Sequence, residues 1–205
     1  CREFYHCTCR TDPQYITPDF DGTVKDLLYT EAFDVIETGF FQTEVFEPLC
    51  IKHLMDKQVK NLSGGELQRV AITICLAKEA DIYLIDEPSA YLDSNQRMNA
   101  AKTIRRMMEK SGKSGMIIDH DMYFLDMVSD SMMVFGGNPG HEGIADGPFD
   151  MREGMNRFLK AVDITFRRDA ETHRPRINKP DSRLDREQKS KGEYYYADPT
   201  ASGKK

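Results

Sequence analysis

Apolar residues recur at helical spacing in the stretch that follows Gly65. The positions that share one face are Leu67, Val70, Ala71, Ile74 and Cys75. A period near 3.6 residues predicts a helix from Gly65 to about Lys78. Residues 1–22 contain prolines and glycines that interrupt regular structure, so this stretch is expected to be irregular. The pattern from Thr23 to about Lys60 predicts short amphipathic helices.

Short apolar runs alternate with helical patterns in the next part of the chain. IYLI (82–85) and MIID (116–119) are brief and apolar at successive positions, which predicts parallel strands buried on both faces. Asp93 or Ser94 can cap a helix between them that lasts until the Gly- and Ser-rich residues 111–115. A short helix at 122–128 and a strand at 132–135 follow. This rhythm predicts an α/β sheet with helices on its faces.

The last third of the chain is less regular. Gly136 to Gly140 predict a turn, residues 151–162 predict a last helix, and the polar end is expected to be extended. No internal repeat is visible.

The composition predicts a protein outside the membrane. The chain has 205 residues, of which 40% are apolar, enough for one sizeable core, and its mean hydropathy is −0.58. Its apolar runs are far shorter than the roughly 20 residues of a membrane-spanning helix. Because the first 30 residues lack the order of a signal peptide, a cytoplasmic location is expected. The first residue is Cys1 rather than Met, which suggests a fragment.

Charge and cysteine content add two expectations. The net charge of −6 does not favour general nucleic-acid binding, although residues 167–191 carry nine Lys and Arg against five Asp and Glu. The five cysteines are scattered and odd in number, so reduced thiols are expected. Cys7 and Cys9 could contact a metal, but the paired Cys-x-x-Cys sets usual for such sites are missing.

Acidic residues and a histidine follow two of the predicted strands. Asp86 and Glu87 come directly after the first strand, and His120 follows the second. Ligands of parallel sheets gather at the carboxyl ends of strands, so one acid could hold Mg²⁺ through water and the other could activate water, with His120 near a phosphate. Alternatively, the acids simply cap a turn and the histidine is a surface residue.

Ser63, Gly64 and Gly65 stand where the first long helix is expected to begin. Helix N-termini attract anions through bare backbone N–H groups, so a phosphate could bind there. An ordinary serine cap with glycine for a tight entry is the alternative.

Together these stretches resemble the ABC-type ATPases. LSGGELQ (62–68) resembles their signature motif, IYLIDE (82–87) their Walker B strand, AYLD (90–93) their D-loop, and His120 their switch histidine. Gln14 is similar to the Q-loop glutamine. More narrowly, LIDEPSAYLDSNQR, ITFRRD…RPRINK (164–179) and the tyrosines 194–196 resemble the second nucleotide-binding domain of the RNase L inhibitor family, the twin-ATPase iron–sulfur proteins that split ribosomes.

The resemblance implies a role for each matching residue. Glu87 would be the general base and His120 would contact the γ-phosphate, while Asp86 and Gln14 would serve the Mg²⁺ ion. The residues implied in nucleotide binding are Ser63, Gly64, Gly65, Glu66, Gln14 and Asp93, the last at the seam with the other ATPase half of the same protein. ATP and Mg²⁺ are the implied substrate and cofactor.

Parts of such proteins are missing from this sequence. A phosphate-binding loop needs G-x-x-x-x-G-K-[ST], but the one Gly-Lys-Ser run, at 112–114, has Met107 where the earlier glycine is required. The iron–sulfur domain and the first ATPase half are also missing. We therefore expect a P-loop NTPase-like ABC half-domain that lacks its Walker A portion and is inactive alone. Its expected parts are residues 1–22 (core remnant with the Q-loop), 23–80 (helical signature subdomain), 81–166 (ATPase core) and 167–205 (basic tail).

The tail and its partners follow from the same resemblance. The tail arginines that carry the resemblance are Arg167, Arg168, Arg174 and Arg176. In the family this segment resembles a hinge that contacts ribosomal RNA, although a solvated basic rim is the alternative. The implied partners are the small ribosomal subunit and release and initiation factors, with no membrane. The other readings are a truncated non-catalytic binding module and another soluble ABC ATPase, such as a transporter's motor subunit.

Overall fold

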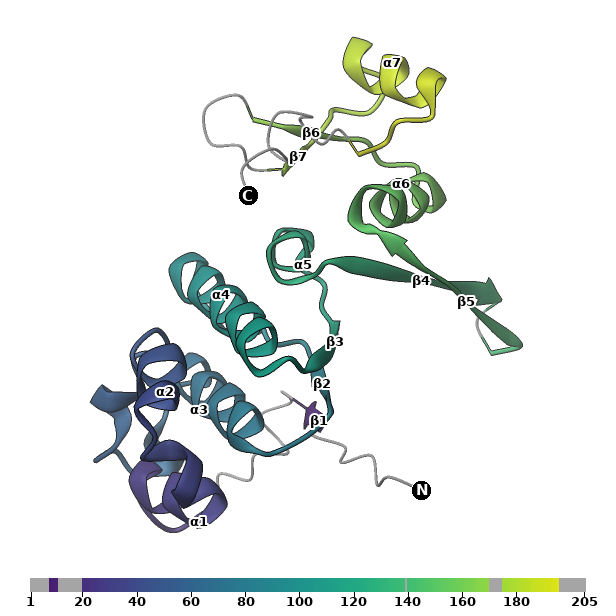
Figure 1. Cartoon of the computed structure of the whole chain (residues 1–205). Helices are drawn as coiled ribbons and strands as arrows, with labels where there is room; N and C mark the ends of the chain where they lie inside the picture. Colours follow the sequence, from purple (N-terminus) through teal and green to yellow (C-terminus); the bar gives the residue numbers. More distant parts are fainter. Residues whose placement is uncertain (1–7, 11–19, 139, 170–174, 196–205) are drawn as a thin grey trace. The chain divides into compact units, whose positions relative to one another are not determined.

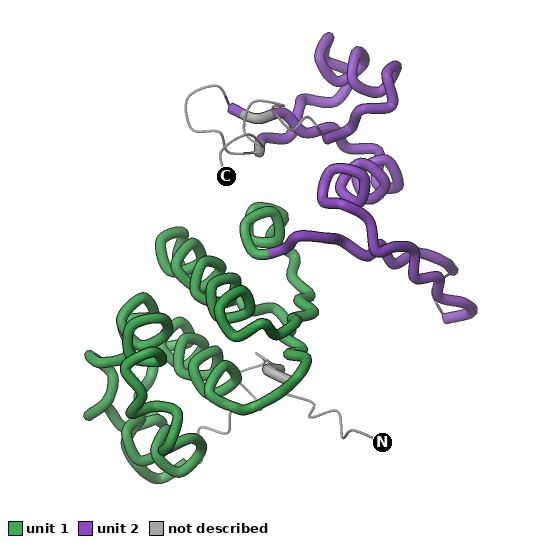
Figure 2. Tube along the Cα trace, in the orientation of Figure 1, with its two compact units in different colours: residues 1–128 green, residues 129–205 purple. Residues whose placement is uncertain are grey.

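The computed structural model describes residues 8–10, 20–138, 140–169 and 175–195. They belong to two compact units, residues 1–128 and 129–205, which are taken separately below (Figure 2). None of the described helices is long and apolar enough to cross a membrane.

The first unit is built on a parallel three-stranded sheet (Figure 1). Its order is β1 (Thr8–Arg10), β2 (Ile82–Asp86) and β3 (Ser114–Ile118), and Leu84 of β2 pairs with Thr8 on one side and Met116 on the other. Helix α3 (Gly64–Ala77) precedes β2, α4 (Ser94–Ser111) joins β2 to β3, and α5 (Met122–Val128) follows β3. The predicted α/β architecture and these helices are confirmed, and the residues before 22 include one short strand.

Strands β2 and β3 are buried on one face only, so the prediction of burial on both faces is wrong. Tyr83 and Ile85 are 3% and 2% exposed and share a core cluster with residues of α3 and α4. The alternate positions are open, since Met116 is 44% and Ile118 58% exposed. Successive side chains of a strand point to opposite faces, and the described helices that share this core lie against one of them.

A layer of short helices contributes most of the remaining core of this unit. Its elements are α1 (Val24–Ile36), α2 (Gly39–Phe41), the π-helix η1 (Gln42–Phe46) and the 3₁₀ helices η2 (Ile51–Leu54) and η3 (Val59–Asn61). Thr23 caps α1 in a reciprocal pair with Asp26, whose carboxylate accepts the Thr23 N–H at 2.8 Å. The fully buried side chains include Leu28, Phe41 and Ile51. The predicted short amphipathic helices are confirmed.

The second unit begins with a long hairpin. Strand β4 (Ser131–Asn138) pairs antiparallel with β5 (Glu142–Asp150), and α6 (Met151–Ala161) follows. The turn predicted at residues 136–140 is wrong for its first part, because β4 continues through two glycines to Asn138. Strand β5 was not predicted at all, since its glycine-rich sequence has little strand propensity of its own.

The described residues after α6 (to 169, and 175–195) are folded rather than extended, contrary to prediction. Strands β6 (Phe166–Arg168) and β7 (Pro175–Ile177) form a second hairpin, and α7 (Arg183–Lys191) follows. Buried polar side chains join these elements: Thr165, Asn178, Asp185 and Gln188. Within this network the Thr165 hydroxyl donates to Asp185 at 2.5 Å and the Asn178 amide donates to Thr165 at 2.9 Å. Mutual hydrogen bonding allows a polar sequence to form a buried core.

Candidate functional site

The turn after β2 presents two carboxylates at the carboxyl end of the sheet. Asp86 is the last residue of β2 and is exposed, and Glu87 follows it with a φ of +46°. The Glu87 N–H donates to the carbonyl of Ile118 at 2.7 Å, which holds this conformation. Positive φ is uncommon outside glycine and concentrates at functional sites. The backbone here is therefore shaped to aim the Glu87 side chain.

His120 meets Glu87 across the two neighbouring strands. Its Nε2 lies 2.9 Å from Oε1 of Glu87, and both side chains reach solvent, being 89% and 46% exposed. A carboxylate and an imidazole in contact at an open edge can together orient and deprotonate a water molecule. The structure thus brings together two residues that lie 33 positions apart in the sequence.

The first turn of α3 is tied together by Glu66. Its Oε2 accepts from the N–H and the hydroxyl of Ser63, both at 2.9 Å, and its Oε1 lies 2.6 Å from Nζ of Lys57. The Lys57 hydrogen bond, with the Ser63 N–H next, lowers the pKa of Glu66 to about 2. Glu66 is thus ionised beside the helix N-terminus, and Lys57 balances its charge.

Both glycines of this turn face Tyr91. A Cβ at Gly64 would lie 3.2 Å from the Tyr91 ring, and one at Gly65 would lie 2.8 Å from the Tyr91 carbonyl oxygen. Tyr91 itself has a φ of +59° and a side chain that is 61% exposed. Close packing against Tyr91 is thus a structural reason for glycine at position 65, in addition to any role in binding a ligand.

Side chains of Gln68 and Asp93 connect α3 and α4 to the backbone around the site. Gln68 of α3 is 3% exposed, and its Nε2 donates to the carbonyl of Pro88 at 3.3 Å, so the helix is linked to the turn that carries Glu87. Asp93 caps α4 by accepting the N–H groups of Asn95 and Gln96 at 2.9 and 2.8 Å. Of the alternatives left open for Asp93 and Ser94, the structure selects Asp93.

The acids fit a magnesium ion that is held mainly by water and phosphate. Within the described parts of the chain no group of three His, Cys, Asp or Glu side chains could hold a metal ion by itself. Mg²⁺ keeps several waters and is usually bound by one or two carboxylates together with substrate phosphates. The exposed carboxylate of Asp86, next to Glu87, suits that mode of binding.

Several predicted residues lie elsewhere or outside the described residues. Gln14 and Arg174 are outside them, as is the side chain of Arg168. In the second unit Arg176 pairs with Asp169 at 3.0 Å, and Arg167 donates to Asn178 at 3.5 Å. The side chains of the Cys7 and Cys9 pair also lie outside what the structure describes.

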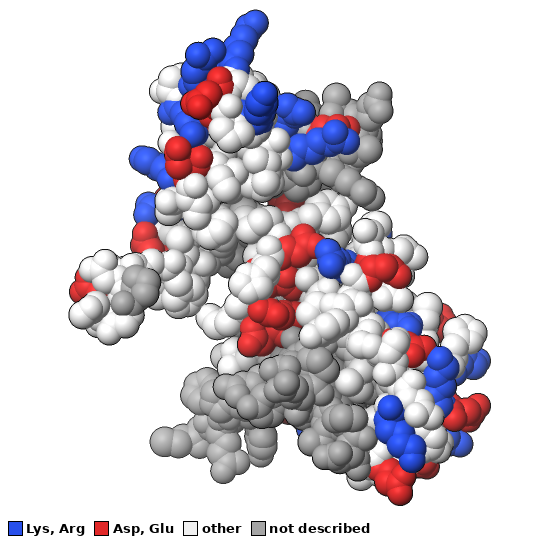
Figure 3. Space-filling view, turned by 180° about the vertical axis from the view of Figure 1, so that it is seen from behind, with Lys and Arg blue, Asp and Glu red and all other residues white. Residues whose placement is uncertain are grey.

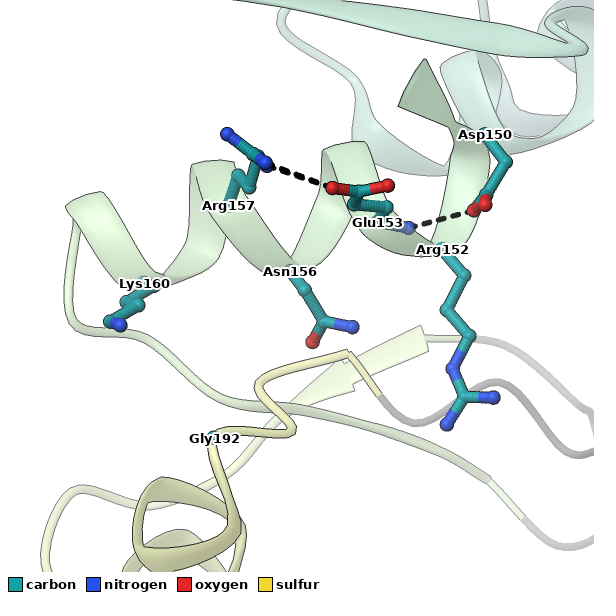
Figure 4. A pocket seen from close by; sticks show the side chains of 7 residues that line it. All are labelled: Asp150, Arg152, Glu153, Asn156, Arg157, Lys160 and Gly192. Atoms are coloured by element: carbon teal, nitrogen blue, oxygen red, sulfur yellow. Dashed lines mark hydrogen bonds and ion pairs between the residues drawn. The ribbon is translucent and has the colours of Figure 1, made fainter.

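The second unit has a groove of about 400 Å³ along α6 (Figure 4). Its lining residues are Asp150, Arg152, Glu153, Asn156, Arg157, Lys160 and Gly192. Arg157 pairs with Glu153 at 2.9 Å and Asp146 at 2.7 Å, and Arg152 lies 3.4 Å from Glu193. Opposite charges are also interspersed on the face shown in Figure 3. Because both of its arginines are paired with acids, this groove is a weaker candidate than the Glu87–His120 pair.

The contacts of Gln68 and Tyr91 were not anticipated from the sequence, although both residues lie inside stretches that carry the resemblance. Gln68 is the last residue of LSGGELQ, and Tyr91 is the aromatic of AYLD. A buried glutamine and an exposed tyrosine give no signal in a single sequence, because their partners are set by the packing of α3 against the turn after β2.

The chain is similar to known proteins in both sequence and fold. A family model described as ABC transporter matches residues 19–90. Translation initiation factor rli1 of Schizosaccharomyces pombe is 49% identical over 184 residues, which make up 90% of this chain and 31% of that protein.

Two solved structures share the fold over nearly the whole chain. An RNase-L inhibitor is 52% identical with a TM-score of 0.81, covering 95% of this chain and 38% of its own. The archaeal ribosome recycling factor aABCE1, in complex with the archaeal ribosomal stalk protein aP1, is 54% identical with a TM-score of 0.80, covering 90% and 36%. The chain therefore spans about a third of the length of the proteins it matches. At this identity over nine-tenths of its length, the chain belongs to the RNase L inhibitor family of ABC-type ATPases.

Proposed function

We propose that this chain is the carboxyl-terminal part of the second nucleotide-binding domain of a ribosome-recycling ATPase. The observation that carries the proposal is the 2.9 Å contact between Glu87 and His120, at the sheet edge where the first acid, Asp86, ends β2. Nothing in a merely structural turn requires an acid and a histidine to meet in solvent at the carboxyl ends of two parallel strands.

In this proposal Glu87 takes the proton of the water that attacks the terminal phosphate of ATP. His120 positions that water and contacts the phosphate. Mg²⁺, held through water by Asp86 and, as the resemblance implies, by Gln14, would neutralise charge on the phosphates. General-base catalysis of this kind contributes about 10²- to 10⁴-fold to a rate.

The first turn of α3 faces the other ATPase half in this proposal. The first N–H groups of a helix have no intrahelical acceptor, so those of Gly64 and Gly65 can donate to the γ-phosphate of a nucleotide held by the partner domain. Ser63, whose N–H and hydroxyl donate to Glu66 in this structure, would turn its hydroxyl to the phosphate once the nucleotide is bound. Glu66 fixes the turn, and Asp93 lies at the seam between the two halves.

The proposed role on the ribosome is inferred from the relatives. One relative is described as a translation initiation factor, and a solved relative is a ribosome recycling factor bound to a ribosomal stalk protein. We propose that ATP-driven closure separates ribosomal subunits, with the small subunit, its RNA, and release and initiation factors as partners. The basic segment from residue 167, with Arg167, Arg168, Arg174 and Arg176, would contact ribosomal RNA. We keep the four functional parts expected from the sequence, residues 1–22, 23–80, 81–166 and 167–205, as part of this proposal.

Replacing Glu87 in the full-length protein that carries this chain tests the proposal. Glu87→Gln keeps the size of the side chain but removes the base, so we expect ATP turnover to fall at least about 100-fold while ATP binding is kept. The matched control is Glu79→Gln, an exposed glutamate between α3 and β2, which should turn over ATP normally.

The readouts are steady-state phosphate release, nucleotide retention after gel filtration, and subunit dissociation in a sucrose gradient. Turnover by Glu87→Gln at the rate of the control would refute the proposed base. A full-length protein that neither binds ATP nor sediments with ribosomal subunits would favour a non-catalytic binding module.

A further inference from the structure

The carboxylate of Asp119 bonds the turn after β3 to the turn after β2. Its Oδ2 accepts the N–H of Ser89 at 2.9 Å, and its Oδ1 accepts the Ser89 hydroxyl at 2.8 Å. The same Oδ1 accepts the N–H of Asp121 at 2.7 Å. Ser89 is 6% exposed, so this contact is shielded from competing water. One side chain therefore makes three hydrogen bonds, two of them to a residue 30 positions away.

These bonds lie next to the Glu87–His120 pair in the chain. Asp119 immediately precedes His120, and Ser89 lies two residues after Glu87. A second tie joins the same two turns, since the Glu87 N–H donates to the carbonyl of Ile118 at 2.7 Å. The two turns are thus joined at two successive residues, Ile118 and Asp119, directly before His120.

The contact between Glu87 and His120 depends on these backbone ties more than on packing. The two side chains are 46% and 89% exposed, so solvent reaches both of them. An exposed acid–histidine pair is weak by itself, because solvent screens it and each side chain loses rotamer freedom. Something else must hold the two backbones at the right separation.

We propose that Asp119 is a positioning residue that locks the two turns together and so sets the separation of Glu87 and His120 for the reaction. The inference rests on the proposed function, since it concerns the same site. Asp121 has a different task. It accepts the N–H groups of Tyr123 and Phe124 at the start of α5 and pairs with Arg97 of α4 at 3.0 Å. Of these two acids, Asp119 is thus the one that accepts hydrogen bonds from the turn after β2.

The test uses the full-length protein with Asp119→Ala, Ser89→Ala and the double variant. We expect Asp119→Ala to lower kcat for ATP about 10- to 100-fold, the scale of a misplacement near 1 Å, with KM for ATP changed less than about twofold. Ser89→Ala removes only the hydroxyl bond and should have a smaller effect. The double variant should match Asp119→Ala, because both changes break one connection.

Asp81→Ala is the matched control. Asp81 is another acid next to this sheet, but it is exposed, stands just before β2 at the opposite end from the site, and pairs with Lys113 at 3.2 Å. Its loss should leave kcat and KM within about twofold of the parent protein. An equal loss of kcat in Asp81→Ala would overturn the proposal, because any acid of the sheet would then have the same effect.

Amide hydrogen exchange gives a readout that does not depend on turnover. In the parent protein the N–H groups of Ser89 and Asp121 should be protected, and in Asp119→Ala both should exchange at least about tenfold faster. Unchanged exchange, or faster exchange with an unchanged kcat, would overturn the positioning role. Normal turnover by Glu87→Gln would instead refute the proposed base, and the exchange data would still decide whether Asp119 joins the two turns.

Discussion

Replacing Gly65 by alanine should destabilise the chain, although alanine is the better helix former. The added Cβ would lie 2.8 Å from the Tyr91 carbonyl oxygen and 3.3 Å from Oε1 of Gln96. The first distance is shorter than real Cβ contacts allow, and the obstacle is backbone. Tyr91 cannot move away freely, since it is already held at a φ of +59°.

The expected change in the free energy of unfolding is the difference between two opposing effects. Forcing a methyl group into a packed site costs about 1–3 kcal/mol, while alanine gains about 0.5–1 kcal/mol over glycine in a helix. Their difference is a net loss of up to about 2.5 kcal/mol, with a central value of about 1 kcal/mol. For a chain of this size each kcal/mol corresponds to about 2–4 °C in Tm. Urea unfolding and thermal melting of the 205-residue chain measure both quantities.

Two matched glycines make the test specific. Gly39 is the first residue of α2 and has no atom within 4 Å of its added Cβ, so Gly39→Ala should be neutral or stabilising. Gly64→Ala meets only the exposed Tyr91 ring, which can swing aside, and should be close to neutral. If Gly65→Ala proves as stable as Gly39→Ala, then the contact with Tyr91 is not the reason for the glycine.

Two further predictions concern stability. The pKa of Glu66 is about 2 in the folded chain against 4.5 ordinarily, so its stabilisation is complete above about pH 4.5 and is lost as the pH falls toward 2. Because Lys57 is half exposed, we expect about 1–2 kcal/mol, and urea midpoints of Glu66→Gln should lack this part of the pH dependence. Asn178→Ala should cost about 1–3 kcal/mol, since it leaves Thr165 and Gln188 short of a partner; melting against the exposed Lys179→Ala measures this loss.

The sequence predicted well those elements whose signals are local. Helix α3 has its apolar stripe, α4 its Asp93 cap, and α5 was predicted at its observed bounds. Strand β5 was missed because its pairing with β4, rather than its own residues, makes it a strand. Helix α7 was missed because it is polar nearly all round, although Ser182 at its N-cap and Gly192 at its C-cap are signals that could have identified it.

The site was predictable in its residues but not in its connections. The positions of Glu87 and His120 after two strands implied a shared edge, and the structure places their side chains 2.9 Å apart. The hydrogen bonds of Asp119 to Ser89 could not be inferred, because they depend on how two turns meet. Burial of β3 was overestimated for a similar reason. Apolar residues allow both faces of a strand to be buried, but they do not show that other elements pack against both faces.

The register of the sheet has a consequence for the order in which this unit folds. Strands β2 and β3 are joined by a single helix, so their pairing closes a short stretch of chain, whereas Thr8 of β1 must find Leu84 across the entire helical layer. Loop closure becomes less favourable as the loop lengthens, and pairings between distant residues form slowly. We expect β2, α4 and β3 to assemble first and β1 to add last. Of these three strands, the one synthesised first is therefore the last to pair.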